Sequence, residues 1–399
     1  MLAPQKRIAV VVSHPIQHFT PFYRAIAEQD GLDLKVFFCS NIGVVPYWDA
    51  GMGVTVKWAG NLTDGYAHEF LPEALAIATT SFWDVNNPAI ATALRRYAPD
   101  VVVICGYSQI TALRALVWCR LCGVPAVMIS DSEMKTPRRW WLRFLRALVL
   151  PVLWRQFSAF LTAGDENERA LSRYGVSRSR MFRSPLTINE PMYREAHRNK
   201  AKARANVREE LGIAPESFVY LVVGKLLSRK RPMDVVEAFL RYVQRAPEAG
   251  IALLLCGDGV QRGEIERRLS GVERQVRMAG FVNVDRLPLY YAASDSLIHS
   301  AESDPHPLVC SEAAAMGLPM ILSDRIGAIG KSDIARENDN AILYPCGDIE
   351  ALVEAMSRLR GDPALYTRMS SASLEIFDQC CLEASLAGLK RAVREVTTT

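Results

Sequence analysis

The chain has 399 residues, of which 50% are hydrophobic and 23% are charged, and its formal net charge is +4. This composition is typical of a globular protein with two or more domains and argues against long disordered regions. The small net charge gives no reason to expect nucleic acid as a partner, because nucleic-acid-binding proteins usually carry a concentrated basic patch.

The amino terminus predicts a strand and not an export signal. Its apolar run is only IAVVV, which is too short for the core of a signal peptide. No stretch reaches the ~18–20 uninterrupted apolar residues of a spanning helix. The cysteines lie mostly within apolar runs, as buried thiols do in a reducing compartment, and the pair Cys119 and Cys122 has no second pair or histidine partner. We therefore expect a cytoplasmic protein without a metal site.

Short apolar runs alternate with helical patterns along the whole chain. In the first half the expected strands are Ile8–Val12, Leu34–Phe38, Val101–Cys105, Ala126–Ile129 and Ala159–Thr162. In the second half they are Val219–Val223, Ala252–Cys256, Val276–Ala279, Ser296–His299, Met320–Ser323 and Ala341–Tyr344. Apolar strands that alternate with helices indicate parallel sheets covered on both faces. The two series predict an α/β protein with two Rossmann-like, doubly wound domains that face a central cleft.

The expected domain boundary lies near residues 185–205, where prolines interrupt the strand rhythm and a highly charged helical stretch begins. The first domain is then 1–190 and the second 205–374. A last helix is expected at about Leu374–Val396, and residues 375–399 can pack back on the first domain. Ligands of open α/β sheets bind beyond the carboxyl ends of the strands, so the residues just after each strand are the candidates for chemistry.

Polar residues follow three of the expected strands in the first half. They are His14, Gln17, His18, Tyr107, Asp131 and Glu133. His18 and Gln17 can hydrogen-bond a polar ligand, or the loop can equally cap a helix and bury a satisfied histidine. Asp131 can help to position a substrate, or it can cap the helix that follows.

The segment Lys135–Arg155 is basic, aromatic and strongly apolar. A helix of this kind can lie in an anionic membrane interface. The alternative is a core helix whose arginines reach out to the solvent. Trp140 and Trp141 lie beside the paired arginines Arg138 and Arg139 and favour membrane contact, on the cytoplasmic face of the inner membrane.

Two lysines follow the first strand of the second half, within VVGKLLSRKRP. Lys225 and Lys230 lie five positions apart, after Gly224, and can converge on one phosphate group and neutralise its charge. Basic runs are more often solvated loops. The position of this run between a strand and a helix favours the phosphate site.

The stretch SAESDPHPLVCSEAAAMGLP contains an acidic loop and the start of a helix. The helix opens at Leu308 and Val309, and its first backbone N–H groups favour a diphosphate. Glu312, in the first turns, can accept hydrogen bonds from ribose hydroxyls, or it can simply complement the helix dipole. Asp304 lies in the preceding loop.

In order and spacing these motifs resemble the carboxyl-terminal domain of the retaining glycosyltransferase family 4 (glycosyltransferase group 1), which has the GT-B fold. The resemblance covers about residues 218–360. It rests on Gly224-Lys225-Leu226 with Lys230, on Gly257-Asp258-Gly259, on Asp304 eight positions before Glu312, and on Gly317-Leu318-Pro319. More weakly, HPIQHFTPFYRAIA and the segment Trp48–Leu71 resemble one bacterial branch of the family.

The resemblance implies that Lys225 and Lys230 hold the donor diphosphate, that Glu312 holds the ribose, and that Asp304 contacts the donor sugar. The remaining donor-binding candidates are Gly224, Gly257, Phe281, Val282, Leu308 and Val309. Asp131 stands where relatives have a polar residue near the reacting sugar. Four features depart from the family pattern: Lys225 replaces the usual Arg, Asp304 replaces the usual Glu, His306-Pro307 replaces the usual Phe-Gly, and the first strand lacks a glycine-rich loop after it. Glu302, two residues before Asp304, is an alternative acid.

The expected function is therefore retaining transfer of a sugar from a UDP- or GDP-sugar to a glycan or lipid-linked acceptor, in bacterial surface polysaccharide or glycolipid synthesis. No metal is expected, because no Asp-x-Asp motif follows an expected strand, and no cofactor is expected beyond the nucleotide sugar. Two alternatives stay open. A sugar-nucleotide 2-epimerase shares the fold but needs further cleft acids and histidines. An inactive sugar-nucleotide-binding scaffold is suggested by the replacements at Asp304 and Lys225.

Overall fold

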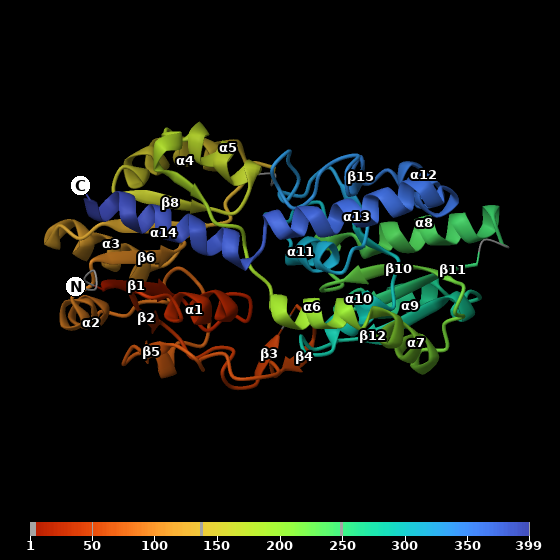
Figure 1. The fold of residues 1–399 in the computed structure, drawn as a ribbon, viewed down its shortest axis with the longest axis horizontal. Helices are drawn as coiled ribbons and strands as arrows, with labels where there is room; N and C mark the ends of the chain where they lie inside the picture. Colours follow the sequence, from red (N-terminus) through yellow and green to blue (C-terminus); the bar gives the residue numbers. More distant parts are fainter. Residues whose placement is uncertain (1–4, 50, 136–138, 248–249, 399) are drawn as a thin grey trace. The chain divides into compact units, whose positions relative to one another are not determined.

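A computed structural model describes residues 5–398 apart from 50, 136–138 and 248–249 (Figure 1). The chain forms two compact units. The amino-terminal unit contains Met1–Tyr47, Gly60–Ile188 and Cys381–Thr399, and the carboxyl-terminal unit contains Trp48–Ala59 and Asn189–Cys380. Each unit is built on one main parallel sheet. The predicted fold class, with two Rossmann-like parallel-sheet domains, is confirmed.

The amino-terminal unit is built on a seven-stranded sheet of order β5-β2-β1-β6-β7-β8-β9. Its strands are β1 (Lys6–Val12), β2 (Leu32–Phe38), β5 (Ala67–Phe70), β6 (Val101–Cys105), β7 (Ala126–Ser130), β8 (Ala159–Thr162) and β9 (Met181–Arg183). All neighbouring strands pair in parallel. The strand order reverses between β1 and β6, which makes the loops after these two strands the usual place for a ligand.

Helices cover both faces of this sheet. They are α1 (Thr20–Ala27), α2 (Ile90–Tyr97), α3 (Ile110–Cys122), α4 (Trp140–Trp154), α5 (Asp165–Arg173) and α14 (Leu382–Thr398), with short 3₁₀ turns at Ala74–Ala76 and Arg178–Arg180. On one face, Phe22 of α1 and Leu389 of α14 join a buried cluster with the strands. On the other face, Leu94 of α2 and Leu116 of α3 do the same. The strands are therefore buried on both faces, which explains their continuous apolar sequences.

The carboxyl-terminal unit is built on a six-stranded parallel sheet of order β12-β11-β10-β13-β14-β15. Its strands are β10 (Phe218–Val223), β11 (Ile251–Cys256), β12 (Val276–Gly280), β13 (Ser296–His299), β14 (Met320–Ser323) and β15 (Ala341–Tyr344). Its helices are α6 (Glu190–Arg198), α7 (Lys200–Glu210), α8 (Pro232–Arg245), α9 (Arg262–Arg268), α10 (Leu287–Ala292), α11 (Leu308–Ala315), α12 (Ile349–Gly361) and α13 (Pro363–Gln379), with 3₁₀ turns at Ser228–Lys230 and Glu273–Gln275. In Figure 1, α8 and α12 lie on one side of the sheet and α6, α7 and α10 on the other. Within this unit the strand order reverses between β10 and β13.

One short segment of the first half of the chain packs with the carboxyl-terminal unit. We call this segment, Trp48–Ala59 apart from residue 50, the strap. It contains β4 (Val54–Val56) and most of β3 (Tyr47–Asp49), which together form a separate two-stranded sheet. Met52 and Val56 of the strap are buried. No strand was expected at β3, β4, β5 or β9, because each is only three or four residues long and lacks a continuous apolar run.

The expectation of one final helix over about Leu374–Val396 is wrong. The structure has two helices: α13 ends at Gln379 and α14 begins at Leu382. The break at Cys380 and Cys381 is where the chain leaves one unit and enters the other.

Helix α4 is almost fully exposed, which is unusual for so apolar a sequence. Only Leu150 and Trp154 of α4 are buried. Its exposed large apolar side chains are Trp140, Trp141, Leu142, Phe144, Leu145, Leu148, Val149 and Val152. The alternative of a core helix is therefore wrong. Residues 136–138, which include Arg138 of the expected membrane-contact segment, lie outside the described residues. No helix in the described part of the chain is long and apolar enough to span a membrane.

Helix α14 is docked on the amino-terminal unit through a glycine. A Cβ atom at Gly388 would lie 1.9 Å from the backbone oxygen of Arg183 in β9. Ser385, one turn earlier, donates a hydrogen bond to the Pro185 oxygen at 2.6 Å. The helix can therefore approach β9 this closely only if residue 388 has no side chain.

Gly388→Ala is expected to lower the free energy of unfolding by about 1–3 kcal/mol, because the added methyl group forces α14 away from β9. Urea unfolding followed by circular dichroism measures the change. Gly361→Ala is the matched control, since Gly361 is also helical and nothing lies within 4 Å of its added Cβ. Alanine there should be neutral or slightly stabilising. Equal stability of the two variants would contradict the close contact.

Candidate functional site

The carboxyl ends of β10, β11 and β13 bring three loops of the carboxyl-terminal unit to one edge. Strand β10 pairs in parallel with β11 on one side and with β13 on the other. The loop after β10 carries Lys225 and Lys230, the loop after β11 begins at Gly257, and the loop after β13 carries Asp304. The donor-site candidates of the sequence therefore lie on the same edge of the sheet, at its switch point.

The loops after β10 and β11 touch through their backbones. A Cβ atom at Gly257 would lie 1.8 Å from the Gly224 oxygen, and one at Gly259 would lie 2.6 Å from the Leu226 oxygen. The Leu226 amide donates to the Asp258 oxygen at 2.9 Å. Only glycine allows this approach, so the loop that carries Lys225 has a fixed path.

Lys230 is held by a buried charge network. Its ammonium pairs with Oδ2 of Asp304, and His299 Nε2 contacts the same oxygen at 2.8 Å. Burial by itself raises the pKa of Asp304, but His299 and Lys230 outweigh it and hold that pKa well below its usual range. Burial lowers the pKa of His299, so the ring is neutral at pH 7 and donates its Nε2–H to the carboxylate.

His299 and Asp49 are two members of this site that the sequence analysis missed. His299 is the last residue of β13, and a polar residue at a strand end was the available signal. Asp49 lies in the strap, and its Oδ2 is 2.6 Å from Lys225 Nζ. Asp49 Oδ1 also accepts the backbone amides of Gly51 and Met52, each at 3.0 Å. Burial acts to raise the pKa of Asp49, yet Lys225 and the two amides lower it overall.

Glu312 lies in α11 among aromatic hydroxyl groups. Tyr291 of α10 donates to Oε2 of Glu312 at 2.7 Å, and Tyr193 of α6 also bonds this carboxyl group. Burial raises the pKa of Glu312 in spite of both tyrosines. Leu308 and Val309 open the same helix after Pro307, without a side-chain cap. The first amides of a helix have no intrahelical acceptor, so they are available to a ligand.

Phe281 and Val282 follow β12, and this segment is in contact with the strap. The ring of Phe281 meets the indole of Trp58 with centroids 6.0 Å apart and planes at 67°. Asn283, two residues after Phe281, accepts a hydrogen bond from the Ala59 amide at 3.1 Å and donates one to the Lys57 oxygen at 2.7 Å. The strap is therefore tied to the segment expected to flank the nucleobase.

The acceptor-side candidates lie at the carboxyl edge of the amino-terminal sheet. His14, Gln17 and His18 follow β1, and the hydroxyl of Ser13 lies 2.8 Å from His14 Nδ1. His18 packs against Phe19 with ring centroids 4.4 Å apart. Burial lowers the pKa of both histidines to about 4, and for His18 the neighbouring His14 contributes.

The remaining candidates of this unit differ in exposure. Tyr107, after β6, accepts a hydrogen bond from Arg146 of α4 at 3.1 Å and meets the Trp154 ring edge-on at 4.8 Å. Tyr107 therefore holds α4 in place. After β7, Asp131 is exposed and Glu133 is buried. Asp131 is therefore open to the solvent at this edge, whereas Glu133 is not.

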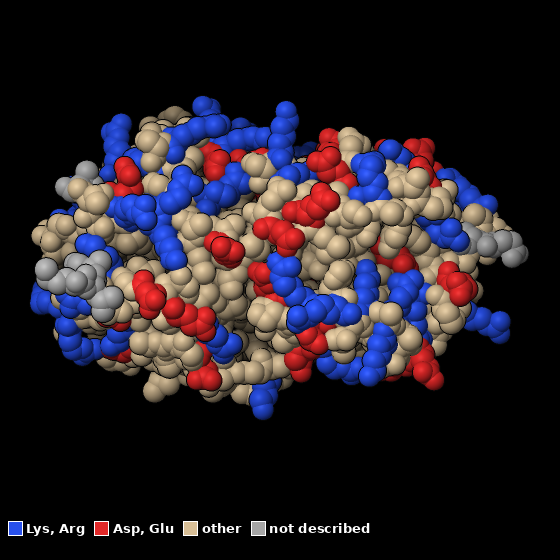
Figure 2. Space-filling view, in the orientation of Figure 1, with Lys and Arg blue, Asp and Glu red and all other residues tan. Residues whose placement is uncertain are grey.

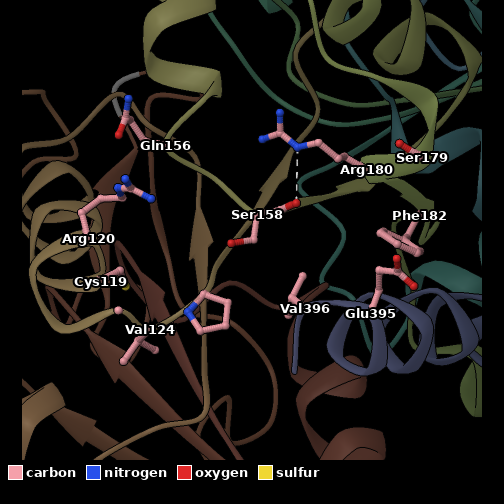
Figure 3. Close-up of a pocket in the computed structure, with 12 residues that line it drawn as sticks. Cys119, Arg120, Val124, Gln156, Ser158, Ser179, Arg180, Phe182, Glu395 and Val396 are labelled. Carbon is pink, nitrogen blue, oxygen red and sulfur yellow. Dashed lines mark hydrogen bonds between the residues drawn. The ribbon is translucent and has the colours of Figure 1, made fainter. Parts of the chain in front are cut away.

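A cavity of about 420 Å³ lies elsewhere in the amino-terminal unit (Figure 3). Its lining includes Pro125, Ser158 and Arg180, which immediately precede β7, β8 and β9. Arg180 Nε donates to the Ser158 oxygen at 3.4 Å (Figure 3). The cavity is therefore at the amino edge of the sheet, away from the candidate loops. Among the described residues, no group of three or more His, Cys, Asp or Glu side chains is arranged to hold a metal ion.

Residues 203–375 match the family model of glycosyl transferases group 1. A lipopolysaccharide core biosynthesis glycosyltransferase of Rhizobium meliloti, LpsD, is 29% identical over 170 residues, which are 42% of this chain and 46% of that protein. A D-inositol 3-phosphate glycosyltransferase of Nocardia farcinica is 27% identical over 212 residues, 51% of this chain and 45% of that one. The chain thus spans about half the length of these curated relatives. The matches support a glycosyltransferase.

Solved structures resemble the whole chain in fold. Anabaena Alr3699/HepE, crystallised in complex with UDP and glucose, superposes with a TM-score of 0.71 at 15% identity over 97% of this chain and 99% of that one. WaaG, a glycosyltransferase involved in lipopolysaccharide biosynthesis, gives 0.64 at 16% identity over 98% and 100%. At this level of identity the likeness shows the fold, which is GT-B.

Lowering the pH from 7 to 4.5 is expected to destabilise the protein through His14 and His18. Their folded pKa values of about 4 lie below the unfolded value of about 6.5, so the unfolded state binds more protons as the pH falls. The contribution of the two histidines to the free energy of unfolding is fully present above pH 6.5 and is lost as the pH falls toward 4. Urea midpoints measured across this range should fall less steeply for the double variant H14Q/H18Q than for the wild type.

Gln17→Ala is the control for this measurement, since residue 17 lies between the two histidines and does not titrate. It should keep the wild-type slope. If the double variant also keeps that slope, the two histidines are not buried in their neutral form.

Proposed function

We propose that the protein is a retaining glycosyltransferase that moves a sugar from a UDP- or GDP-sugar to a glycan or lipid-linked acceptor, in bacterial surface polysaccharide or glycolipid synthesis. One observation carries this proposal. Lys225 and Lys230 lie in the loop after β10, and Glu312 and the opening amides belong to α11, which follows the loop after β13 at the same edge of the carboxyl-terminal sheet. This set offers two cations, a ribose acceptor and free backbone donors, which are the groups a nucleoside diphosphate requires.

The two lysines stabilise the departing diphosphate. Each ammonium has three N–H donors, and the structure uses one of them for a carboxylate: Asp49 for Lys225 and Asp304 for Lys230. The remaining donors can bind phosphate oxygens. Because each carboxylate is itself fixed by other hydrogen bonds, the two cations are held in position before the charge develops, and little reorganisation is needed during the reaction.

Asp304 has two tasks in this proposal. Its Oδ2 accepts from His299 and Lys230. Its other oxygen, Oδ1, is the one that can accept a hydrogen bond from the donor sugar. The side chain of Asp304 is shorter than that of the usual glutamate, so its contact with the sugar depends on the path of the loop after β13. That path is fixed by the Gly327 amide, which donates to the backbone oxygen of Asp304 at 2.9 Å.

In the reaction, the bond between the anomeric carbon and the diphosphate oxygen breaks, and a bond from the same carbon to the acceptor oxygen forms on the same face. The acceptor proton goes to the departing diphosphate, which needs no separate general base. Retention and this proton route rest on the resemblance of the motifs. The acceptor is bound by the amino-terminal unit, where His14, Gln17, His18 and Asp131 follow β1 and β7.

Contact with a membrane surface is the second part of the proposal. Apolar side chains cover the exposed surface of α4, and Arg139, Arg143 and Arg155 are exposed beside them. Figure 2 shows basic side chains gathered over the region where Figure 1 has α4 and α5. Exposed tryptophan and phenylalanine with arginine are the composition of a helix that lies in an anionic lipid interface. This surface suits a peripheral enzyme with a lipid-linked acceptor.

Lys225→Ala and Lys230→Ala are each expected to lower kcat for donor turnover about 100-fold, because each removes a cation from the leaving diphosphate. This kcat is measured as the rate of slow hydrolysis of UDP-glucose or GDP-mannose, with the released nucleoside diphosphate quantified by chromatography. Lys202→Ala is the matched control, as this exposed lysine lies on α7, outside the site loops.

Full turnover in both site variants would overturn the diphosphate assignment. An epimerised nucleotide sugar as the product would instead identify a 2-epimerase. Tight binding of the nucleotide sugar without any turnover, even with acceptor lipids present, would identify a scaffold.

The double variant W140S/F144S is expected to weaken vesicle binding about 100-fold or more, because burial of each aromatic side chain contributes roughly 1.5–3 kcal/mol. Co-sedimentation with phosphatidylethanolamine–phosphatidylglycerol vesicles measures it. High salt should also weaken binding, because it screens the arginines. Trp83→Ser is the control, since Trp83 is 75% exposed and lies outside α4. Unchanged sedimentation of the double variant would exclude α4 as the contact surface.

A further inference from the structure

The strap is anchored at both of its ends to loops of the candidate donor site. Near its start, Asp49 pairs with Lys225 at 2.6 Å, in the loop after β10. At its end, Asn283 binds the backbone of Lys57 and Ala59, next to the segment after β12. Its middle is held by the buried side chains of Met52 and Val56. The strap therefore has a fixed course along the edge of the carboxyl-terminal sheet.

Trp58 is the strap residue whose aromatic ring contacts Phe281, in the segment after β12. Its indole and the ring of Phe281 meet edge to face, and both residues are only half-buried. Both side chains keep part of their surface open to solvent, so a ligand at this edge can reach them. Gly280, just before Phe281, has a φ of +67°, which turns the backbone sharply at the end of β12.

The spacing of the strands connects this aromatic pair to the lysine. Strands β12, β11 and β10 are consecutive neighbours in the sheet. Neighbouring strands lie about 4.8 Å apart, so the loops after β12 and β10 are separated by about 10 Å. A nucleoside with two phosphates can span that separation, with its base at Phe281 and its phosphates at Lys225.

We propose that Trp58 contacts the nucleobase of the donor, so that a segment from the first half of the chain completes the donor site of the carboxyl-terminal unit. This inference rests on the proposed function. Aromatic rings bind bases through stacking, which is tolerant of base identity. Trp58 thus adds affinity for nucleosides of either kind, and it leaves recognition of the phosphates to the lysines.

Calorimetric titration of the full chain with UDP, GDP and inorganic pyrophosphate tests the proposal. Trp58→Ala should weaken UDP and GDP binding about tenfold, the loss expected when one stacking partner of a base is removed. Trp58→Phe should keep most of the affinity, because it keeps an aromatic ring. Pyrophosphate, which has no base, should bind all variants equally.

Trp48→Ala is the matched control, since Trp48 belongs to the same strap and is 65% exposed. It should bind all three probes as the wild type does. If Trp58→Ala binds UDP as tightly as the wild type, the inference is wrong while the proposed function stands. If Trp58→Ala weakens pyrophosphate to the same extent, Trp58 only supports Lys225 and the inference is also wrong. If the wild type binds neither UDP nor GDP, both the proposed function and the inference fail.

Discussion

Parallel pairing around β10 is the constraint on which the candidate site depends. Because β10 runs in the same direction as β11 and β13, the loops that follow these strands all emerge at one edge. Gly257 then brings the backbone of the second loop against Gly224, closer than any side chain would allow. Lys225, Lys230, Asp304 and the opening turn of α11 take their positions from this arrangement.

The charges at this edge are arranged as fixed pairs. Lys225 has Asp49 and Lys230 has Asp304, and each carboxylate has further hydrogen bonds from backbone amides or from His299. An ion pair stabilises a fold only weakly, because competition from water at the surface, or desolvation of both charges when buried, offsets their attraction. Its effect here is on geometry: the ammonium groups are held where an anion can meet them. The same network explains why a neutral His299 is buried at the end of β13.

Two helices of the amino-terminal unit differ in how they place their apolar residues. In the amino-terminal unit, α14 buries its apolar face through Leu389, Ala392 and Val393, as a helix of a soluble core does. Helix α4 leaves its apolar residues in solvent, anchored by Trp154 and by the bond from Arg146 to Tyr107. An apolar surface of this extent is unfavourable in water and is typical of an interaction site. The two helices therefore serve different purposes, although both are rich in apolar residues.

The sequence by itself determined the central strands of both sheets and the loops that carry Lys225, Lys230, Asp304 and Glu312. A strand buried on both faces must be apolar whatever its partners are, so its sequence alone reveals it. Only the tertiary structure decided the place of the strap, the break at Cys380 and the partners of the lysines. Asp49 and Lys225 are 176 positions apart, and no local pattern encodes such a contact. The short strands β3 and β4 have no continuous apolar run that a sequence pattern could reveal. They form because the unit on which they pack stabilises them.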